Sequence, residues 1–542
     1  MDADFLIIGS GFGGSVSALR LVEKGYRVVM LEKGRRLGSG DFPRTNWNLK
    51  RWLWLPVLGF RGPFKMTFLR HVTVLSGVGV GGGSLVYANT LPIPKDDFFA
   101  AESWARLADW KGELAPHYPT VRRMLGVTEN PQTTRADDVI REIGRDLGLP
   151  EGEFRRSPVA VWFGEPGVTV PDPYFGGEGP ERTGCTQCGG CMIGCRHGAK
   201  NTLDKNYLWL AERGGLVIEA DTEAIWVREV PGGGYQVDAL QGASIFGRTR
   251  CSWKASNVIF AGGVLGTVPL LLELRASPDG LPRLSPRVGD FVRTNSEALL
   301  AVVSGQHNVD YSKGIAIGSV LHTDEHSYLE PVRYPSGSGF FRLLAAPHAA
   351  GRNPLVRGLR AIGQCLRHPV RALRALFVLD WAKHTVILLY MRALEGHLRM
   401  RLGAGGRLKT YVSGGAAPRA SIPEATDLAL RAGEKLDGLP QSLVTELLLD
   451  TPTTAHILGG ACMGTTPEEG VIDARHRVFG YEGLYVIDGA AVSANPGVNP
   501  ALTIAALAER AMSFVPPRDA GAPFLRMGSG ANQDGGCADI SN

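Results

Sequence analysis

The sequence predicts an α/β fold class with a Rossmann-like domain at its start, and three observations lead there. A strand-length apolar run, Phe5–Ile8, passes directly into GSGFGG at 9–14, a G-x-G-x-x-G turn. Apolar runs that end in a turn recur far along the chain, at 258–263 and 484–489. The chain has 542 residues, of which 44% are hydrophobic and 20% charged, so two or three structural units with large cores are expected.

The elements after the first turn continue the dinucleotide-binding pattern. Apolar residues three apart predict a helix over 15–24, and a second buried strand follows over 26–31. That strand ends at Glu32, which can accept a hydrogen bond from a ribose hydroxyl. An acid here disfavours a 2′-phosphate, so FAD or NAD is expected and NADP is not.

Three glycines of the turn have separate predicted tasks. Gly9 allows the tight turn, Gly11 lets a pyrophosphate approach the backbone, and Gly14 lets helix and strand pack closely. The helix N-terminus then faces the phosphate. The alternative is a glycine-rich turn with a structural role only.

Composition and charge exclude several other classes. Glycine is in excess, at 71 residues without a collagen period, which indicates tight turns and close backbone approach. Lys and Arg exceed Asp and Glu by 58 − 53 = 5, too few to argue for a nucleic-acid partner. There is no apolar run of about 18 residues, and Asp2 and Asp4 stand where a signal peptide would be basic. We therefore expect a cytoplasmic protein.

Three later segments also indicate a bound ligand. GVGVGGGS at 77–84 has too many glycines for a regular element and predicts a loop whose backbone approaches something flat or charged. The run at 258–263 predicts a buried strand and turn, with a helix over 265–272. The run at 484–489 predicts a strand that closes on an acid, with a helix over 502–512.

Taken in order, these segments resemble the glucose-methanol-choline (GMC) oxidoreductase family, FAD-dependent alcohol oxidases and dehydrogenases, and most of all its cholesterol-oxidase-like branch. The matching segments are GSGFGG at 9–14, GVGVGGGS at 77–84, NTLDKNYL at 201–208, AGGVLGT at 261–267, HILGG at 456–460, LYVIDG at 484–489 and GVNPALTIAALAER at 497–510.

The resemblance implies a Rossmann-like FAD-binding domain assembled from discontinuous segments, with an α+β sheet-based substrate domain over the flavin. The expected boundaries are 1–40, 71–95, 196–292 and 455–515 for the FAD-binding domain, 41–70 for a lid or membrane-facing loop, 96–195 and 293–454 for the substrate domain, and 516–542 for a tail. No histidine attachment motif is recognisable, so noncovalent FAD is expected.

The resemblance also assigns residues to the cofactor. Besides Gly9, Gly11, Gly14 and Glu32, they are Gly79, Gly82, Gly83, Ser84, Asn89, Ala261, Gly262, Asp488, Gly489, Asn499 and Pro500.

The family's catalytic positions fall on His456 and Asn499, where a histidine and an amide orient the substrate hydroxyl and move its proton. Glu330 lies in a context similar to the glutamate that isomerises the steroid double bond. The alternatives are a satisfied core histidine, a helix-capping asparagine and a glutamate paired with Arg333 or another cation.

The implied reaction is oxidation of a hydrophobic alcohol, a 3β-hydroxysteroid, to the ketone, with or without double-bond isomerisation. Two alternatives stay open. One is a dehydrogenase of a long-chain alcohol or a sugar, and the other is an electron-transfer flavoprotein without alcohol chemistry.

Four cysteines form a C-x2-C-x2-C-x3-C run at Cys185, Cys188, Cys191 and Cys195. The spacing matches the bacterial ferredoxin run and favours an iron–sulfur cluster, which would pass electrons to an acceptor protein or quinone instead of O2. Structural zinc or no metal are the alternatives.

Two stretches are basic and apolar without acids. Trp52–Phe60 is apolar between Arg51 and Arg61, and 352–374 carries six arginines among aliphatic residues with helical spacing, interrupted at Pro369. Peripheral membrane contact is one interpretation, and a buried aromatic lid with a solvated basic helix is the other.

Overall fold

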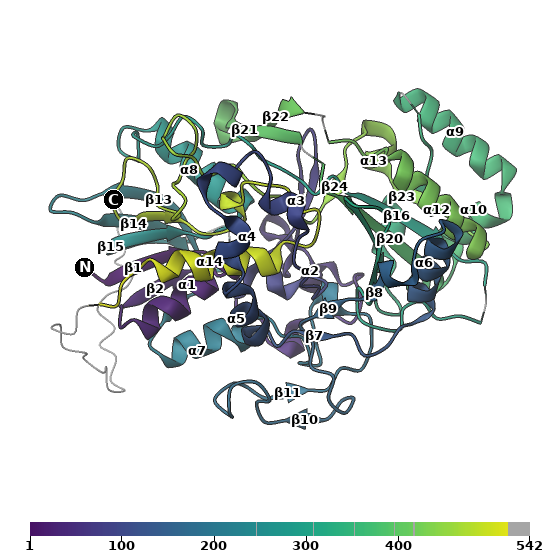
Figure 1. Cartoon of the computed structure of the whole chain (residues 1–542), viewed down its shortest axis with the longest axis horizontal. Coiled ribbons are helices and arrows are strands. Elements are labelled where there is room, and N and C mark those ends of the chain that lie inside the picture. The colour runs from purple at the N-terminus through teal and green to yellow at the C-terminus, as the bar shows by residue number, and fades with distance from the viewer. Residues whose placement is uncertain (245–246, 307, 352, 395, 416–417, 519–542) are drawn as a thin grey trace.

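The protein was analysed as a computed structural model, which describes residues 1–518 except 245–246, 307, 352, 395 and 416–417. Most of the predicted tail, 519–542, thus lies outside the described residues. Two large sheets organise the molecule: one carries the N-terminal glycine-rich turn, and the other lies at the far end of the long axis (Figure 1). The α/β prediction is confirmed, whereas the domain boundaries stay a prediction.

The first sheet runs in the order β12-β2-β1-β15-β14-β13, with β25 paired to the end of β15. The pairings among β12, β2, β1, β15 and β25 are parallel, and β13 and β14 add an antiparallel hairpin. Such parallel strands are buried on both faces, which explains their continuous apolar sequence. The strands are β1 (Ala3–Ile8), β2 (Val28–Leu31), β12 (Val217–Glu219), β13 (Thr222–Glu229), β14 (Tyr235–Gln241), β15 (Thr249–Phe260) and β25 (Leu484–Val486).

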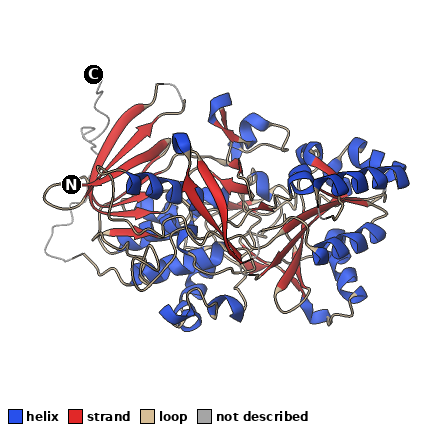
Figure 2. Ribbon diagram, turned by 90° about the horizontal axis from the view of Figure 1, so that it is seen from above, coloured by secondary structure: helices blue, strands red, loops and turns tan. Residues whose placement is uncertain are grey.

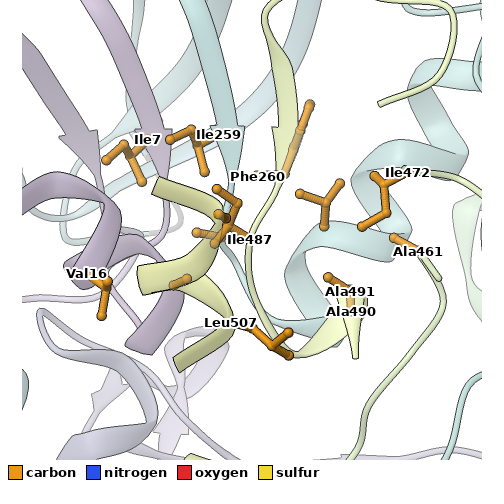
Figure 3. Packing of buried hydrophobic residues seen from close by; sticks show 14 of the residues in the cluster. Ile7, Val16, Ile259, Phe260, Ala461, Ile472, Ile487, Ala490, Ala491 and Leu507 are labelled. Atoms are coloured by element: carbon orange, nitrogen blue, oxygen red, sulfur yellow. The ribbon is translucent and has the colours of Figure 1, made fainter. Parts of the chain in front are cut away.

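Helices α1 (Phe12–Glu23), α7 (Tyr207–Arg213), α8 (Val264–Ala276) and α14 (Ala501–Ser513) pack with this sheet. Figure 3 shows Ile7 and Phe260 from the sheet near Val16 of α1 and Leu507 of α14. Helix α1 begins three residues before its expected start at 15, and α14 begins one residue before its expected start at 502. Strand β15 is longer than expected because its first half pairs with β14.

The second sheet runs in the order β19-β23-β16-β20-β18-β17-β8, and its pairings are antiparallel. Along β20, Val386, Leu388 and Tyr390 pack with helices, whereas Ile387 and Leu389 point to the other face, as the two-residue period of a strand requires. The strands are β8 (Phe154–Arg156), β16 (Ala298–Val303), β17 (Ser319–His322), β18 (Ser327–Val332), β19 (Ala345–Pro347), β20 (Thr385–Arg392) and β23 (Leu439–Leu443).

The outer face of the second sheet is covered by α6 (Arg135–Asp146) and α12 (Pro423–Lys435). At the β19–β23 edge lie α9 (Pro354–Arg367), α10 (Pro369–Phe377) and α13 (Val444–Leu449), which Figure 1 labels at one end of the molecule. Figure 2, seen from above, shows helices gathered at this same end. The predicted interruption at Pro369 is the break between α9 and α10. In the described part of the chain, no helix is both long and apolar enough to cross a membrane.

The segment between the two basic flanks, Trp52–Phe60, is not a uniform exposed anchor. Trp52 is fully buried and stacks on Phe64 with ring centroids 4.8 Å apart, whereas Val57 and Leu58 are exposed at the tip of a short hairpin. The burial of Trp52 therefore favours a buried aromatic lid over a membrane anchor at this residue. The elements here are α2 (Leu49–Trp52), β3 (Trp54–Leu55), β4 (Phe60–Arg61), β5 (Phe64–Phe68) and β6 (Thr73–Gly77).

The remaining elements connect these layers. They are α3 (Asp96–Phe99), α4 (Trp110–Leu114), α5 (His117–Met124), α11 (Trp381–His384), β7 (Thr128–Glu129), β9 (Pro158–Val159), β10 (Thr169–Val170), β11 (Arg182–Thr183), β21 (Gly396–Leu402), β22 (Leu408–Gly415) and β24 (Thr453–Thr454).

Candidate active site

A cavity of about 620 Å³ lies between the two sheets. Its wall on the side of the first sheet includes the glycine-rich turn and Glu32, and its wall on the other side includes Leu299, Ile387 and Leu389 of the second sheet. The cavity therefore joins a polar, glycine-lined end to an apolar end.

The turn at 9–14 is shaped for close approach of a ligand. Gly9 has φ +107°, a left-handed conformation that favours glycine. A Cβ on Gly14 would lie 2.1 Å from the Gly9 carbonyl oxygen, so this glycine allows the tight packing of helix and strand. A Cβ on Gly11 would meet only the Ala261 carbonyl, at 3.9 Å, and would otherwise occupy cavity space.

Helix α1 leaves its first N–H groups available to the cavity. Its N-cap, Gly11, makes no side-chain cap, and its first turn holds no acid. A pyrophosphate fits this end because the N–H groups and the helix dipole favour an anion. The residues present thus fit a dinucleotide.

Glu32 is held at the end of β2 by four hydrogen bonds. One carboxylate oxygen accepts from the Ser10 N–H at 3.1 Å and the Ser10 hydroxyl at 2.7 Å. The other accepts from the N–H groups of Gly34 at 2.8 Å and Gly79 at 3.3 Å. The long loop at 77–84 is therefore joined to the turn through this acid.

Asp488 borders the cavity and holds two segments of its wall together. Its carboxylate accepts from the Gly263 N–H at 2.8 Å, the Thr267 hydroxyl at 2.6 Å and the Ala490 N–H at 2.7 Å. Burial raises the pKa of Asp488 to about 6, although these hydrogen bonds oppose the shift. The acid thereby ties the start of α8 to the end of β25.

Most of the residues assigned to the cofactor border this cavity: Gly9, Gly11, Glu32, Gly82, Gly83, Ala261, Gly262, Asp488, Gly489, Asn499 and Pro500. Gly14, Gly79, Ser84 and Asn89 do not line it. Ser84 donates to the Gly81 carbonyl at 2.7 Å, and Asn89 is buried with φ +72° and with no partner for its amide within the described residues. Their contacts with a cofactor stay predictions.

His456 lies at the apolar end, two residues after the end of β24, and its orientation is set by Glu297. The Nδ1 atom of His456 is 3.0 Å from a carboxylate oxygen of Glu297. Glu297 is buried and also accepts from the Thr454 hydroxyl. Because a carboxylate only accepts, Nδ1 carries a proton and Nε2 of the neutral ring is left to accept one.

The electrostatics of His456 follow from this pair. Burial by itself lowers the pKa of His456, but the charge and hydrogen bond of Glu297, with a smaller contribution from Glu330, raise it above its ordinary value. Sequence reasoning missed Glu297. An acid directly before the apolar strand Ala298–Val303 is the signal that could have found it.

Asn499 is brought to the same point by the start of α14. Its amide nitrogen lies 3.5 Å from Nε2 of His456, while its amide oxygen is buried without a partner in the described structure. The alternative of a helix-capping asparagine is not what is observed, since α14 has Pro500 as its N-cap and no side-chain cap.

Glu330 of β18 lies behind this pair, at the wall of a second cavity. Burial raises its pKa to about 7, against the opposing effects of His456 and of a hydrogen bond with Asn499. The alternative partner, Arg333, instead contacts Asp137 at 3.2 Å. The structure thus brings His456, Asn499 and Glu330 together with Glu297.

The cysteine run does not support the iron–sulfur prediction. Cys185, Cys188, Cys191 and Cys195 are free thiols, and no group of three or more His, Cys, Asp or Glu within the described residues is placed to hold a metal ion. Burial raises the pKa of Cys191 to about 11. The segment reaches the main cavity through Met192.

The sheet, the glycine-rich turn and the histidine–amide pair define a dinucleotide-dependent oxidoreductase. Family models match at 7–46, described as an NAD(P)-binding Rossmann-like domain, and at 414–508, described as GMC oxidoreductase. A cholesterol oxidase from Acinetobacter baumannii is 43% identical over 95% of both chains. One from Mycobacterium tuberculosis is 44% identical over 95% of this chain and 91% of its own.

Among solved structures, a pyridoxine 4-oxidase from Mesorbium loti aligns with a TM-score of 0.59, at 16% identity over 94% of this chain and 98% of its own, which shows a similar fold alone. The chain belongs to the GMC oxidoreductase family, in its cholesterol-oxidase-like branch. It is an FAD-dependent oxidoreductase that acts on CH–OH donors.

Proposed function

We propose that the protein oxidises the hydroxyl of a 3β-hydroxysteroid to the ketone, with O2 as the electron acceptor. The observation that carries this is the His456–Asn499 pair at the apolar end of a cavity whose other end fits a dinucleotide. The similarity to cholesterol oxidases over nearly the whole chain supports the substrate class and the acceptor.

The apolar wall suits a fused-ring or aliphatic substrate better than a sugar. It combines aliphatic side chains of the second sheet with aromatic ones, among them Phe341 and Trp381. Burial of apolar surface contributes roughly 25 cal/mol per Å², so a largely hydrocarbon alcohol gains most from this wall. A sugar would leave many hydroxyls without partners there.

The proposed chemistry uses three side chains of this chain. Asn499 donates to the substrate hydroxyl oxygen, and Nε2 of His456 accepts the hydroxyl proton as the C–H bond of the carbinol carbon breaks. Glu297 holds the ring and stabilises the imidazolium that forms. FAD, when bound, supplies the acceptor of the hydride.

We propose the FAD contacts from the residues that border the cavity. The N-terminus of α1 and Gly11 would hold the pyrophosphate, and Glu32 the ribose. We further propose that the first sheet and its helices form the FAD-binding domain and the second sheet the substrate domain.

A double-bond isomerisation is a second proposed step. Glu330 is a buried carboxyl whose pKa near 7 lets it take and return a proton at neutral pH, and it lies next to Asn499. Glu330→Gln is expected to release the unisomerised ketone while alcohol oxidation continues. Chromatography of the products separates the two ketones, and isomerised product from the variant would remove Glu330 from this role.

Anaerobic mixing with a 3β-hydroxysteroid tests the proposed oxidation. The flavin absorbance should bleach in a single turnover, and admission of O2 should restore it. His456→Ala should keep FAD and slow bleaching by about 10²–10⁴-fold. His326→Ala, at an exposed histidine paired with Asp97, is the matched control. Bleaching of the His456→Ala protein at the wild-type rate contradicts the assignment, and bleaching by a sugar but not by the steroid contradicts the substrate class.

A further inference from the structure

Helix α9 turns its apolar side outward. Leu355, Leu359, Ile362 and Leu366 follow helical spacing and form one stripe, and each is more than half exposed. The buried residues of this helix are Arg357 and Ala361. A surface helix of a soluble protein normally buries its apolar stripe against the core and exposes its polar side. The exposed stripe of α9 is therefore not explained by packing against the protein's own core.

Arg357 shows why the helix is held in this orientation. Its guanidinium donates to the Leu447 carbonyl at 2.5 Å and to the Gly351 carbonyl at 3.1 Å, and it lies 3.6 Å from Asp450. These polar contacts anchor the arginine side of α9 against α13. The apolar side is thereby fixed toward the outside.

Helix α10 continues the same surface, which we call the α9–α10 face. Both helices lie at one end of the molecule, beyond the second sheet (Figure 1). Large exposed apolar patches are uncommon on soluble monomers and mark contact sites. The residues of the face, each more than half exposed, are Leu355, Leu359, Ile362, Leu366, Val370, Leu373, Leu376, Phe377 and Leu379.

The charge around this face has one sign. The sequence from 353 to 379 contains no Asp or Glu. Arg371 and Arg374 pair with Asp437, whereas Arg360 and Arg367 are exposed and form no ion pair within the described residues. Arg352, the remaining arginine of the predicted basic stretch, lies outside the described residues.

We propose that the α9–α10 face docks on an anionic lipid surface. Arg360 donates only to a backbone carbonyl, that of Ala350 at 2.6 Å, so its charge is not neutralised within the described residues. Exposed aliphatic side chains flanked by such arginines match an interfacial helix, in which the apolar face enters the acyl boundary and the cations meet lipid phosphates. At 14 and 9 residues, α9 and α10 are too short to span a bilayer, so they lie on it.

The face is joined to the main cavity by a short chain of contacts. Ala375, the buried residue of α10, packs in one cluster with Trp381 and Phe341, and both aromatic side chains line the cavity. Docking would thus bring the apolar end of the cavity close to the lipid. The delivery of a membrane-borne alcohol rests on the proposed function, whereas the docking itself does not.

Flotation with sterol-free vesicles tests the docking without turnover. The FAD-loaded full chain is mixed at low salt with phosphatidylcholine vesicles that contain or lack phosphatidylserine. Wild type should float with the anionic vesicles, and Leu359→Ser with Leu366→Ser should weaken partitioning by about tenfold or more. Arg360→Gln with Arg367→Gln should reduce the preference for phosphatidylserine.

The matched control replaces apolar residues exposed elsewhere, on the hairpin between β3 and β4. Val57→Ser with Leu58→Ser should leave flotation unchanged. Loss of binding in this control with retention in the α9 variant overturns the proposal, as does a wild type that fails to float.

Size-exclusion chromatography and a steady-state assay complete the test. A wild-type dimer that the α9 substitutions convert to a monomer, without vesicle binding, would assign the face to a second copy of this chain. Turnover of a detergent-dispersed steroid should be equal in wild type and the α9 variant. Absence of that turnover in both contradicts the proposed function alone.

Discussion

At the scale of single residues, a buried carboxylate governs the candidate active site. Glu297 accepts from Thr454 and lies 3.0 Å from Nδ1 of His456, so the histidine has its other nitrogen directed to Asn499. Glu297 therefore orients the imidazole from the Nδ1 side, opposite the nitrogen that lies near Asn499. A histidine held in this way needs no movement to accept a proton.

Replacement of this carboxylate should change both rate and pH profile. Glu297→Gln removes the charge that raises the pKa of His456, so that pKa should fall. Because His456 must be neutral to accept a proton, the rising limb of kcat against pH should move to lower pH. The value of kcat itself should drop by about 10- to 10⁴-fold, since the tautomer and orientation are no longer fixed.

The matched control is Glu446→Gln, a buried acid near Glu297 whose pKa burial raises to about 8. Within the described residues it forms no hydrogen bond or ion pair with His456, so the variant should leave the limb in place. A Glu297→Gln enzyme with the wild-type pH profile would show that Glu297 does not orient the histidine.

A second residue-scale prediction concerns stability. The pKa of Glu330 is about 7 in the folded protein and about 4.5 when unfolded, so the folded state alone holds a proton between these values. The free energy of unfolding therefore falls as pH rises from 4.5 to 7, by about 3 kcal/mol at most, and stays low above pH 7. Glu330→Gln removes this loss.

Thermal melts at pH 4.5 and pH 8 measure the difference. The variant should be more stable than wild type at pH 8, and its advantage should shrink toward pH 4.5. An advantage of equal size at both pH values would mean that the gain has another origin.

At the scale of elements, the turn between β1 and α1 separates two uses of glycine. A Cβ on Gly13 would lie 1.7 Å from the Ile487 carbonyl oxygen, so this position serves the packing of α1. Gly11 has room on the cavity side and an ordinary φ of −71°. The same short motif thus contains one position that the packing of α1 requires and another that faces the cavity.

Two substitutions distinguish these positions. Gly11→Val should give a folded protein that purifies colourless, because the side chain occupies the space of the pyrophosphate. Gly13→Ala should lower the melting temperature or the soluble yield, because backbone must move. Absorbance at the flavin bands and circular dichroism report the two effects. A folded Gly11→Val protein with full FAD occupancy would place the cofactor elsewhere.

At the scale of the whole molecule, the main cavity lies between two sheets whose strands come from distant parts of the chain. A ligand that fills it contacts both. The helices that pack with the first sheet are also joined to one another without a ligand. The Glu509 carboxylate on α14 accepts from Arg20 of α1 at 2.7 Å and from Tyr207 of α7 at 2.7 Å.

Removal of FAD should therefore lower stability without unfolding the protein. A ligand at 100 times its Kd contributes about 2.7 kcal/mol to the free energy of unfolding. The melting temperature of the apoprotein should rise with added FAD, and AMP at the same concentration should produce a smaller rise. A melting temperature that does not depend on FAD would indicate that the cavity is not its site.

Much of this architecture could be predicted from the sequence because it rests on local patterns. The run Phe5–Ile8 with its glycine turn, the strand before 261 and the helix after Pro500 each combine an apolar pattern with a turn signal. Each occurs at the expected place, although β15 begins earlier than the sequence indicates. The C-x2-C-x2-C-x3-C spacing also suggested a cluster, which the arrangement of the thiols does not support. Spacing along the chain does not fix distances between sulfur atoms.

The sequence by itself determined the family and the glycine-rich turn, and it predicted His456, Asn499 and Glu330 as site residues, because short motifs carry their own chemistry. Only the tertiary structure decided that Glu297, 159 residues before His456, is its partner. It also decided that Trp52 is buried while the apolar stripe of α9 is exposed. Periodicity defines the two sides of a helix, but which side faces inward depends on what packs against it, and here Arg357 binds the neighbouring carbonyls.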